Sequence, residues 1–189
     1  MLSESTLVIR LTEGVLVPRA GTIGFNEFHG GPETLLRWLE TQLGLTSPAI
    51  HRADRVNEFA RILDPITDAI FSASMATDRW ATASELLSRR DDLLLAGWNE
   101  QESDALPPLV RDLARATTNH RFSYLGEADR LKAVLVALDA GFKLPSHRCI
   151  LIDHAEAWPA LWREVLTRLT IEEPTKESPL AKKSSALHS

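Results

Sequence analysis

The sequence has a single cysteine, Cys149, and it has no long hydrophobic run. One cysteine cannot form an intrachain disulfide, which fits a reducing compartment. No stretch approaches the roughly 18 apolar residues that a membrane span requires. The N-terminus also lacks a basic segment followed by a long apolar one. We therefore expect a soluble, cytoplasmic protein that has no membrane partner.

An excess of basic residues is missing as well. The 189 residues include 21 Lys and Arg against 26 Asp and Glu, for a net charge of −5. A strongly basic composition would indicate a nucleic-acid binder, and this composition does not, although it still allows a local basic face. The hydrophobic content of 44% is ordinary for a globular protein. The length suits one buried core, or one core plus a helical satellite.

Three catalytic signatures are absent. No Gly-Lys pair occurs, so there is no nucleotide-binding G-x-x-x-x-G-K-[ST] loop; Gly21 and Gly24 lie where its glycines would fall, without the lysine or the magnesium-binding hydroxyl. None of the five lysines has an acidic residue two positions before it, so the [DE]-x-Lys motif of metal-dependent nucleases is missing. The serine signature G-x-S-x-G is missing too. We expect no complete active site and no cofactor.

The N-terminal part of the chain predicts the start of an α/β core. Thr6–Ile9 and Val15–Val17 are short β-branched runs that indicate two strands or a hairpin. The glycine-rich stretch 18–31 predicts a loop. Pro32–Leu43 carries an apolar stripe with a proline in its first turn, and Gly44 is a plausible left-handed stop, so this segment predicts a helix.

A tract of amphipathic segments follows. Asp78 is expected to cap a helix that points Trp80 inward and ends near Gly97. The remaining apolar stripes of helical period are Ala53–Leu63, then Ile66, Ile70, Phe71 and Met75, then Leu109–Ala116 and Glu127–Ala140.

The period changes near the C-terminus. Cys149–Ile152 predicts a buried strand, and Ala155–Leu169 predicts an amphipathic helix. The fold class predicted is therefore a helix-rich α/β protein. Its core would comprise residues 1–50 and 146–171, with an inserted all-helical subdomain at 51–145 and a disordered tail at 172–189.

Asp153 directly follows the predicted strand, as the metal-holding aspartate of a Walker B strand does. His154 stands where an active site would have a glutamate that polarises water. The simpler interpretation is that Asp153 caps the helix expected to begin near Ala155. A zinc site of His147, Cys149 and His154 lacks a second ligand pair. We expect no metal, and an inert, buried thiol at Cys149.

Four basic residues are candidates for DNA contact: Arg79, Arg89, Arg90 and Lys132. Such side chains can bind phosphates, and a solvated helix face is the alternative. The five tryptophans can stack on bases, but three lie on apolar faces of predicted helices, which favours core packing.

Three segments carry a family resemblance: Gly31–Leu45 (GPETLLRWLETQLGL), Ala76–Trp98 (ATDRWATASELLSRRDDLLLAGW) and CILIDHAEAWPALWREVL from Cys149 onward. Together they resemble the N-terminal region of bacterial PD-(D/E)XK nuclease family proteins related to the AddB-type helicase–nuclease subunit. The resemblance spans roughly residues 5–170 and implies a superfamily 1 helicase-like, P-loop-type core that has lost its ATPase residues. It implies a scaffold or DNA-path role in DNA repair and recombination, beside a helicase or nuclease partner subunit.

The family's nuclease motif lies near the C-terminus of much longer chains, so the resemblance carries over no catalytic residue. A truncated product, a split subunit and an expressed fragment all fit this pattern. Two other functions stay open. One is a free-standing interaction protein that docks through its helical insertion, which exposed apolar clusters there would favour. The other is a metal-dependent hydrolase that uses Asp153, His154 and Glu156.

Overall fold

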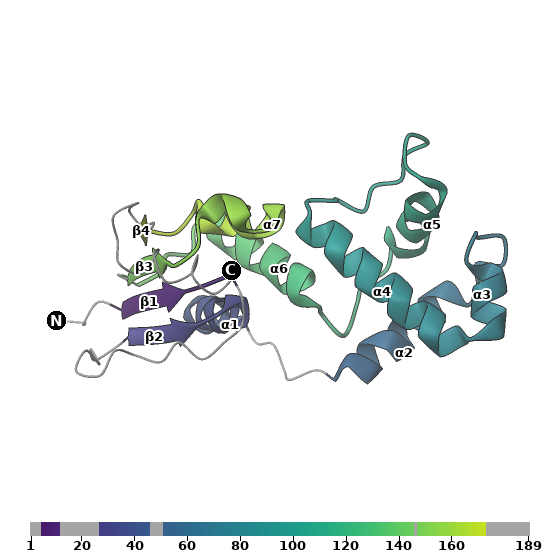
Figure 1. Cartoon of the computed structure of the whole chain (residues 1–189), viewed down its shortest axis with the longest axis horizontal. Coiled ribbons are helices and arrows are strands. Elements are labelled where there is room, and N and C mark those ends of the chain that lie inside the picture. The colour runs from purple at the N-terminus through teal and green to yellow at the C-terminus, as the bar shows by residue number, and fades with distance from the viewer. Residues whose placement is uncertain (1–4, 12–26, 46–50, 146, 173–189) are drawn as a thin grey trace, which may run out of the picture. The chain divides into compact units, whose positions relative to one another are not determined.

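The computed structural model describes residues 5–11, 27–45, 51–145 and 147–172. The chain divides into two compact units (Figure 1). We call residues 1–46 and 131–189 the sheet unit, and residues 47–130 the helical unit. The division falls at Arg130, inside helix α6 (Glu127–Asp139), and not at the predicted position 145. The second half of α6 therefore groups with the sheet.

The sheet unit contains four parallel strands in the order β2-β1-β3-β4. Their bounds are β1 Ser5–Ile9, β2 Glu27–Gly30, β3 His147–Leu151 and β4 Ile171–Glu172. In the register, Leu7 of β1 lies between Phe28 of β2 and Cys149 of β3. Alternate side chains of the two central strands are fully buried, as the period of a strand requires: Leu7, Ile9, Cys149 and Leu151. The α/β class and the strands at Thr6–Ile9 and Cys149–Ile152 are confirmed.

Two strands lie where no strand was predicted. β2 occupies the end of the stretch 18–31, which was predicted to be a loop. Its sequence, Glu-Phe-His-Gly, has no β-branched residue, and Phe28 is 43% exposed, so neither propensity nor alternation marks it. β4 consists of two residues and includes Glu172, which was assigned to a disordered tail. The predicted run Val15–Val17 and the rest of the tail lie outside the described residues.

The helix α1 (Pro32–Leu43) has the bounds predicted for it. It buries its leucine stripe and packs against β1 and β2. At its end Gly44 has a φ of 68°, a left-handed conformation that glycine adopts without a steric penalty. This turn lets the Leu45 N–H donate to the Glu40 carbonyl at 2.8 Å. The predicted glycine stop is confirmed.

The helix predicted over Ala155–Leu169 is interrupted. A 3-10 turn, η1 (Ala155–Ala157), comes first, and the α-helix α7 begins only at Ala160 and ends at Leu166. Pro159 causes the break, because it lacks an N–H and forces the residue before it, Trp158, into an extended conformation with a ψ of 150°. Trp158 and Trp162 are nonetheless buried, with their rings edge to face and their centroids 5.4 Å apart.

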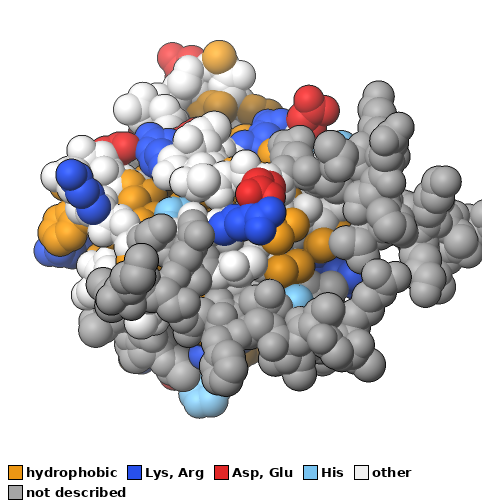
Figure 2. Space-filling view, turned by 90° about the vertical axis from the view of Figure 1, so that its left-hand side faces the viewer, with side chains coloured by type: hydrophobic (Ala, Val, Ile, Leu, Met, Phe, Trp, Pro, Cys, Tyr) orange, Lys and Arg blue, Asp and Glu red, His pale blue; other side chains and the backbone are white. Residues whose placement is uncertain are grey.

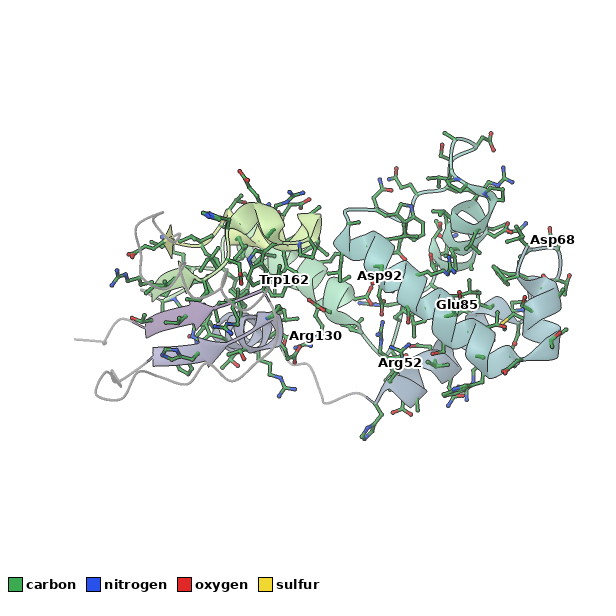
Figure 3. The ribbon with its side chains drawn as sticks, in the orientation of Figure 1. Arg52, Asp68, Glu85, Asp92, Arg130 and Trp162 are labelled. Atoms are coloured by element: carbon green, nitrogen blue, oxygen red, sulfur yellow. The ribbon has the colours of Figure 1, made fainter. Side chains whose placement is uncertain are left out.

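The helical unit is built from α2 (Arg52–Leu63), α3 (Ser72–Thr77), α4 (Arg79–Leu95), α5 (Pro108–Thr117) and the start of α6. Helix α4 packs against α2 and α3, and α5 packs against α2. Arg52, labelled in Figure 3, reaches from α2 to the hydroxyl of Ser88 on α4 at 2.7 Å. The core of the unit includes Val56, Phe59, Leu63, Phe71, Ala83, Leu87 and Leu113.

Two apolar predictions for the helical unit are wrong. The stripe from Ile66 to Met75 is not one helix, since only Ser72–Thr77 is helical, and Ile70 is 63% exposed. Trp80 was predicted to point inward and is 46% exposed. It lies in the first turn of α4, whereas the first buried side chain of that helix is Ala83. None of the helices in the described ranges is both long and apolar enough to cross a membrane.

The predicted cap of α4 is confirmed. Asp78 lies at the N-cap, and its Oδ1 accepts a hydrogen bond from the Ala81 N–H at 2.9 Å. A carboxylate there satisfies a free N–H group and favours the positive end of the helix dipole.

We predict that Asp78→Ala lowers the free energy of unfolding by about 1 kcal/mol, because the helix loses its side-chain acceptor. Asp78→Asn is the matched control, since its amide oxygen can still accept the bond. Urea unfolding followed by circular dichroism measures both variants. Equal stability of the two variants would contradict the capping role.

Candidate functional site

The carboxyl ends of β1 and β3 meet at the centre of the sheet. From β1 the chain continues to β2 on one side, while β3 and β4 lie on the other side. In open parallel sheets the point where the strand order reverses is the usual place for a ligand crevice. Of the predicted degenerate nucleotide site, Asp153 and His154 follow β3 and lie at this point. Its two glycines, Gly21 and Gly24, lie outside the described residues.

Hydrogen bonds join the strand ends beyond the regular ladder. The Ile152 N–H donates to the Ile9 carbonyl at 2.8 Å. The Leu11 N–H, two residues farther along, donates to Asp153 Oδ2 at 2.7 Å. The carboxylate of Asp153 therefore ties the end of β1 to the end of β3. This bond links residues 142 positions apart and extends the pairing of the two central strands.

The helix-capping interpretation of Asp153 is wrong. Residue 154, not Asp153, precedes η1, and no side chain caps that turn. The Asp153 oxygen accepts a backbone N–H from another strand instead. His154 follows as an exposed residue, in the position where a Walker B strand would carry glutamate. One oxygen of the Walker B-like carboxylate thus already accepts a hydrogen bond from the backbone.

Arg10 is a feature of this edge that the sequence did not single out. Its backbone N–H donates to the Gly30 carbonyl at 3.1 Å, which ties β1 to the end of β2. Its Nε is buried and has no hydrogen-bond partner among the described residues. A lone arginine after a strand carries no sequence signal, since only the strand order places it at the reversal point.

The residues considered for zinc do not form a metal site. Within the described ranges, no three His, Cys, Asp or Glu side chains are grouped so as to hold an ion, which also leaves Asp153, His154 and Glu156 ungrouped. The two ring nitrogens of His147 already face protein groups: Nδ1 lies 2.8 Å from the Pro145 carbonyl, and Nε2 accepts the Thr170 N–H at 3.4 Å. Burial raises the pKa of the Cys149 thiol to about 12, so it is no nucleophile at neutral pH.

The exposed arginines proposed for DNA contact are held by carboxylates. Arg79 binds Asp64 through two hydrogen bonds of 2.8 and 2.7 Å, and this hydrogen bonding lowers the pKa of Asp64. Arg89 pairs with Glu85, four residues before it on α4, at 2.6 Å. Lys132 belongs to the sheet unit, is partly buried and has an interaction partner. On the face drawn in Figure 2, basic side chains lie scattered among other groups.

Arg90 is not a surface residue at all. Its side chain is 1% exposed, Nε donates to Glu100 at 2.8 Å, and Nη2 donates to Asp129 at 2.9 Å. The guanidinium carbon lies 4.1 Å from the centre of the Phe122 ring. Burial disfavours its charge, but the bonds and charges of the two carboxylates outweigh burial and raise the pKa of Arg90. The DNA-contact prediction for Arg90 is therefore wrong.

This buried cluster extends to a second arginine. Arg55 on α2 forms a bidentate pair with Asp91, both bonds at 2.8 Å. Its guanidinium passes so close to Gly126 that a Cβ there would lie 2.2 Å from Arg55 Nη2. Sequence reasoning missed these roles because Arg90 and Asp129 are 39 residues apart, with no motif that connects them.

The charge of the helical unit as a whole is acidic. Residues 47–130 contain ten arginines, no lysine and fourteen Asp and Glu, for a net charge of −4. Nonspecific DNA binding depends on neutralising phosphates with a basic surface. The composition of this unit opposes such binding.

No protein-family model and no curated protein matches the chain. The fold defines the chain as an α/β protein with a small parallel sheet and an inserted helical unit.

We predict that Asp153→Ala lowers the free energy of unfolding by about 1–3 kcal/mol, since the partly buried Leu11 N–H loses its acceptor. Asp153→Asn should retain most of the stability, because an amide oxygen can accept the same bond. Chemical denaturation of both variants measures the difference. If Asp153→Ala is as stable as the unmodified chain, the bond does not hold the strand ends.

Two adjacent arginines provide a matched test of burial. We predict that Arg90→Ala lowers the free energy of unfolding by about 3–5 kcal/mol, because the partly buried carboxylates of Glu100 and Asp129 lose the cation that they share. Arg89→Ala should cost less than about 0.5 kcal/mol, since it removes only an exposed pair within one helix. Thermal and urea unfolding of the two variants compare them directly. Similar losses for both would contradict the buried network.

Proposed function

We propose that this chain is a non-catalytic scaffold segment of a DNA-processing protein, of the kind that its resemblance to PD-(D/E)XK nuclease family proteins implies. The arrangement of charges favours a scaffold role over a role in lining the DNA path. The main support is that Arg79, Arg89 and Arg90 each bind a carboxylate within the helical unit. DNA phosphates would have to displace these carboxylates in a unit of net charge −4.

The sheet unit supports the same proposal. A helicase-like ancestor would use the ends of the central strands to hold a nucleotide and its metal ion. Here Asp153 Oδ2 accepts the Leu11 N–H, and the exposed His154 takes the glutamate position. A nucleotide site that has lost its function could keep this carboxylate as a hydrogen-bond acceptor that stabilises the fold. The proposed fold is accordingly a degenerate helicase-like core with an inserted helical unit.

The DNA-path alternative can be tested directly. Fluorescence anisotropy measures binding of the full chain to labelled single- and double-stranded DNA 30-mers. Even at low salt, we expect a dissociation constant above roughly 10⁻⁴ M, the weak end of the range for nonspecific DNA binding. The double variant Arg79→Ala, Arg89→Ala should behave like the unmodified chain. Tight, salt-dependent binding that this variant abolishes would assign the unit to a DNA path and overturn the scaffold proposal.

The scaffold role requires a partner that supplies the chemistry. We expect the tagged full chain, expressed in its own cells, to copurify in stoichiometric amount with a subunit that bears nuclease or helicase motifs. The destabilised Arg90→Ala variant is the control, because capture should depend on a folded helical unit. Recovery of the chain alone, or with proteins that have neither motif, would count against the proposal.

A free-standing interaction protein is the second candidate. The observation that favours it is the exposure of two large apolar side chains of the helical unit, Ile70 and Trp80. The copurification experiment separates the candidates, since this alternative expects a partner without nuclease or helicase motifs.

A further inference from the structure

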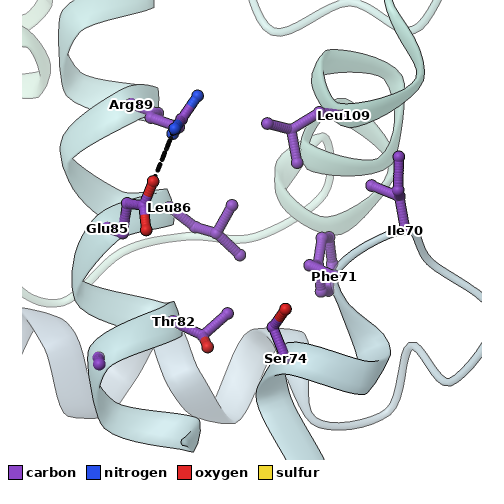
Figure 4. Close-up of a pocket in the computed structure, with 9 residues that line it drawn as sticks. Ile70, Phe71, Ser74, Thr82, Glu85, Leu86, Arg89 and Leu109 are labelled. Atoms are coloured by element: carbon purple, nitrogen blue, oxygen red, sulfur yellow. Dashed lines mark hydrogen bonds and ion pairs between the residues drawn. The ribbon is translucent and has the colours of Figure 1, made fainter.

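The helical unit carries an open apolar groove (Figure 4). It has a volume of about 370 Å³ and lies between the start of α3, one face of α4 and the first turn of α5. Phe71 and Leu86 supply buried apolar surface, and Ile70 and Leu109 add further apolar surface. The polar lining includes Glu85 with its ion-pair partner Arg89. No residue of the strand-end region lines this groove.

Hydrogen bonds hold the backbone at the start of α3, where it forms one wall of the groove. The Ile70 N–H donates to Asp112 Oδ2 on α5 at 2.9 Å, which fixes the backbone that carries this exposed side chain. The Ser72 N–H donates to the Ala69 carbonyl at 3.0 Å, which starts α3. A pre-formed apolar site loses little entropy when a ligand binds.

The helix arrangement indicates the shape of the occupant. Both α4 and α5 pack on α2, and the groove lies between α4 and α5. A helix laid into it would add a member to the bundle and cover Ile70, Leu86 and Leu109. The part of α4 that lines the groove runs from Ala81 to Arg89, about 13 Å of helix, so the groove can hold about two to three turns of a ligand helix.

Charge decides the chemistry of that ligand. Glu85 and Arg89 balance each other on the groove wall, so the groove itself favours neither sign. The surrounding unit has a net charge of −4 and no lysine, and its field attracts cations. We propose that the groove binds one amphipathic helix of a partner protein, with leucine-type side chains spaced at i, i+4 and i+7 on one face and Lys or Arg on the flanks.

This inference rests on the helical unit alone. It stands whether or not the partner is the nuclease or helicase subunit that the proposed function calls for. A failure of copurification therefore leaves it intact, and a failure of the peptide test below leaves the scaffold proposal intact.

Three labelled synthetic peptides of about 14 residues test the groove with the full chain. The first has leucines on one helical face and lysines on the flanks. The second replaces the lysines with glutamates, and the third has the composition of the first with its leucines dispersed around the helix. Fluorescence anisotropy at low salt should show the first peptide bound at least about tenfold more tightly than the other two. Equal affinity for all three would overturn the proposal.

Two exposed apolar positions provide the matched variants. Ile70→Asn in the groove should weaken binding of the lysine peptide at least about fivefold. Val136→Asn in the sheet unit, where Val136 is 70% exposed, should leave binding unchanged. Both sites are exposed, so both variants should fold, which circular dichroism checks. Loss of binding in both variants, or in neither, would overturn the assignment.

A second copy of this chain is the competing occupant. Sedimentation equilibrium of the full chain should show a monomer at micromolar concentration. A dimer that Ile70→Asn converts to a monomer would assign the groove to self-association and overturn the proposal of a partner helix.

Discussion

The guanidinium of Arg90 is the centre on which the helical unit depends. It is carried by α4, is 1% exposed, and donates to carboxylates from the loop after α4 and from the start of α6. Desolvating this charge is unfavourable, and the carboxylates of Glu100, Asp129 and Asp91, together with the Phe122 ring, offset it. Glu100 reaches it from a backbone with a φ of 62°, an uncommon conformation for a residue other than glycine. The network thus joins α4 to the loop after it and to the start of α6.

The sheet unit uses a charged group in the same way. The carboxylate of Asp153 accepts the Leu11 N–H, so that a side chain continues the pairing of two strands past the end of the ladder. Among the described residues, the predicted site residues Asp153, Arg79, Arg89 and Arg90 all bind other groups of the protein. This internal use of charge agrees with the scaffold role that we propose, and the apolar groove near Ile70 is the surface that we propose for a partner.

Helices were predicted well where local rules act alone. Pro32–Leu43 was predicted to the residue, and the Asp78 cap and the Gly44 stop are confirmed, because each depends on atoms within a few residues. The strand β2 was missed because its pairing with β1 is what makes it a strand. The break at Pro159 was missed because the apolar stripe continues through it, with Trp158 and Trp162 both buried.

The sequence by itself determined the α/β class, the main helices, the buried Cys149 and the absence of the nuclease and nucleotide-loop motifs. These follow from composition, period and spacing, which are properties of neighbouring residues. Only the tertiary structure decided the strand order, the bond from Leu11 to Asp153, the exposure of Ile70, and the burial of Arg90 beside an exposed Arg89. The physical reason is that burial and pairing of a charge depend on groups far away in the chain, and helical period cannot report them.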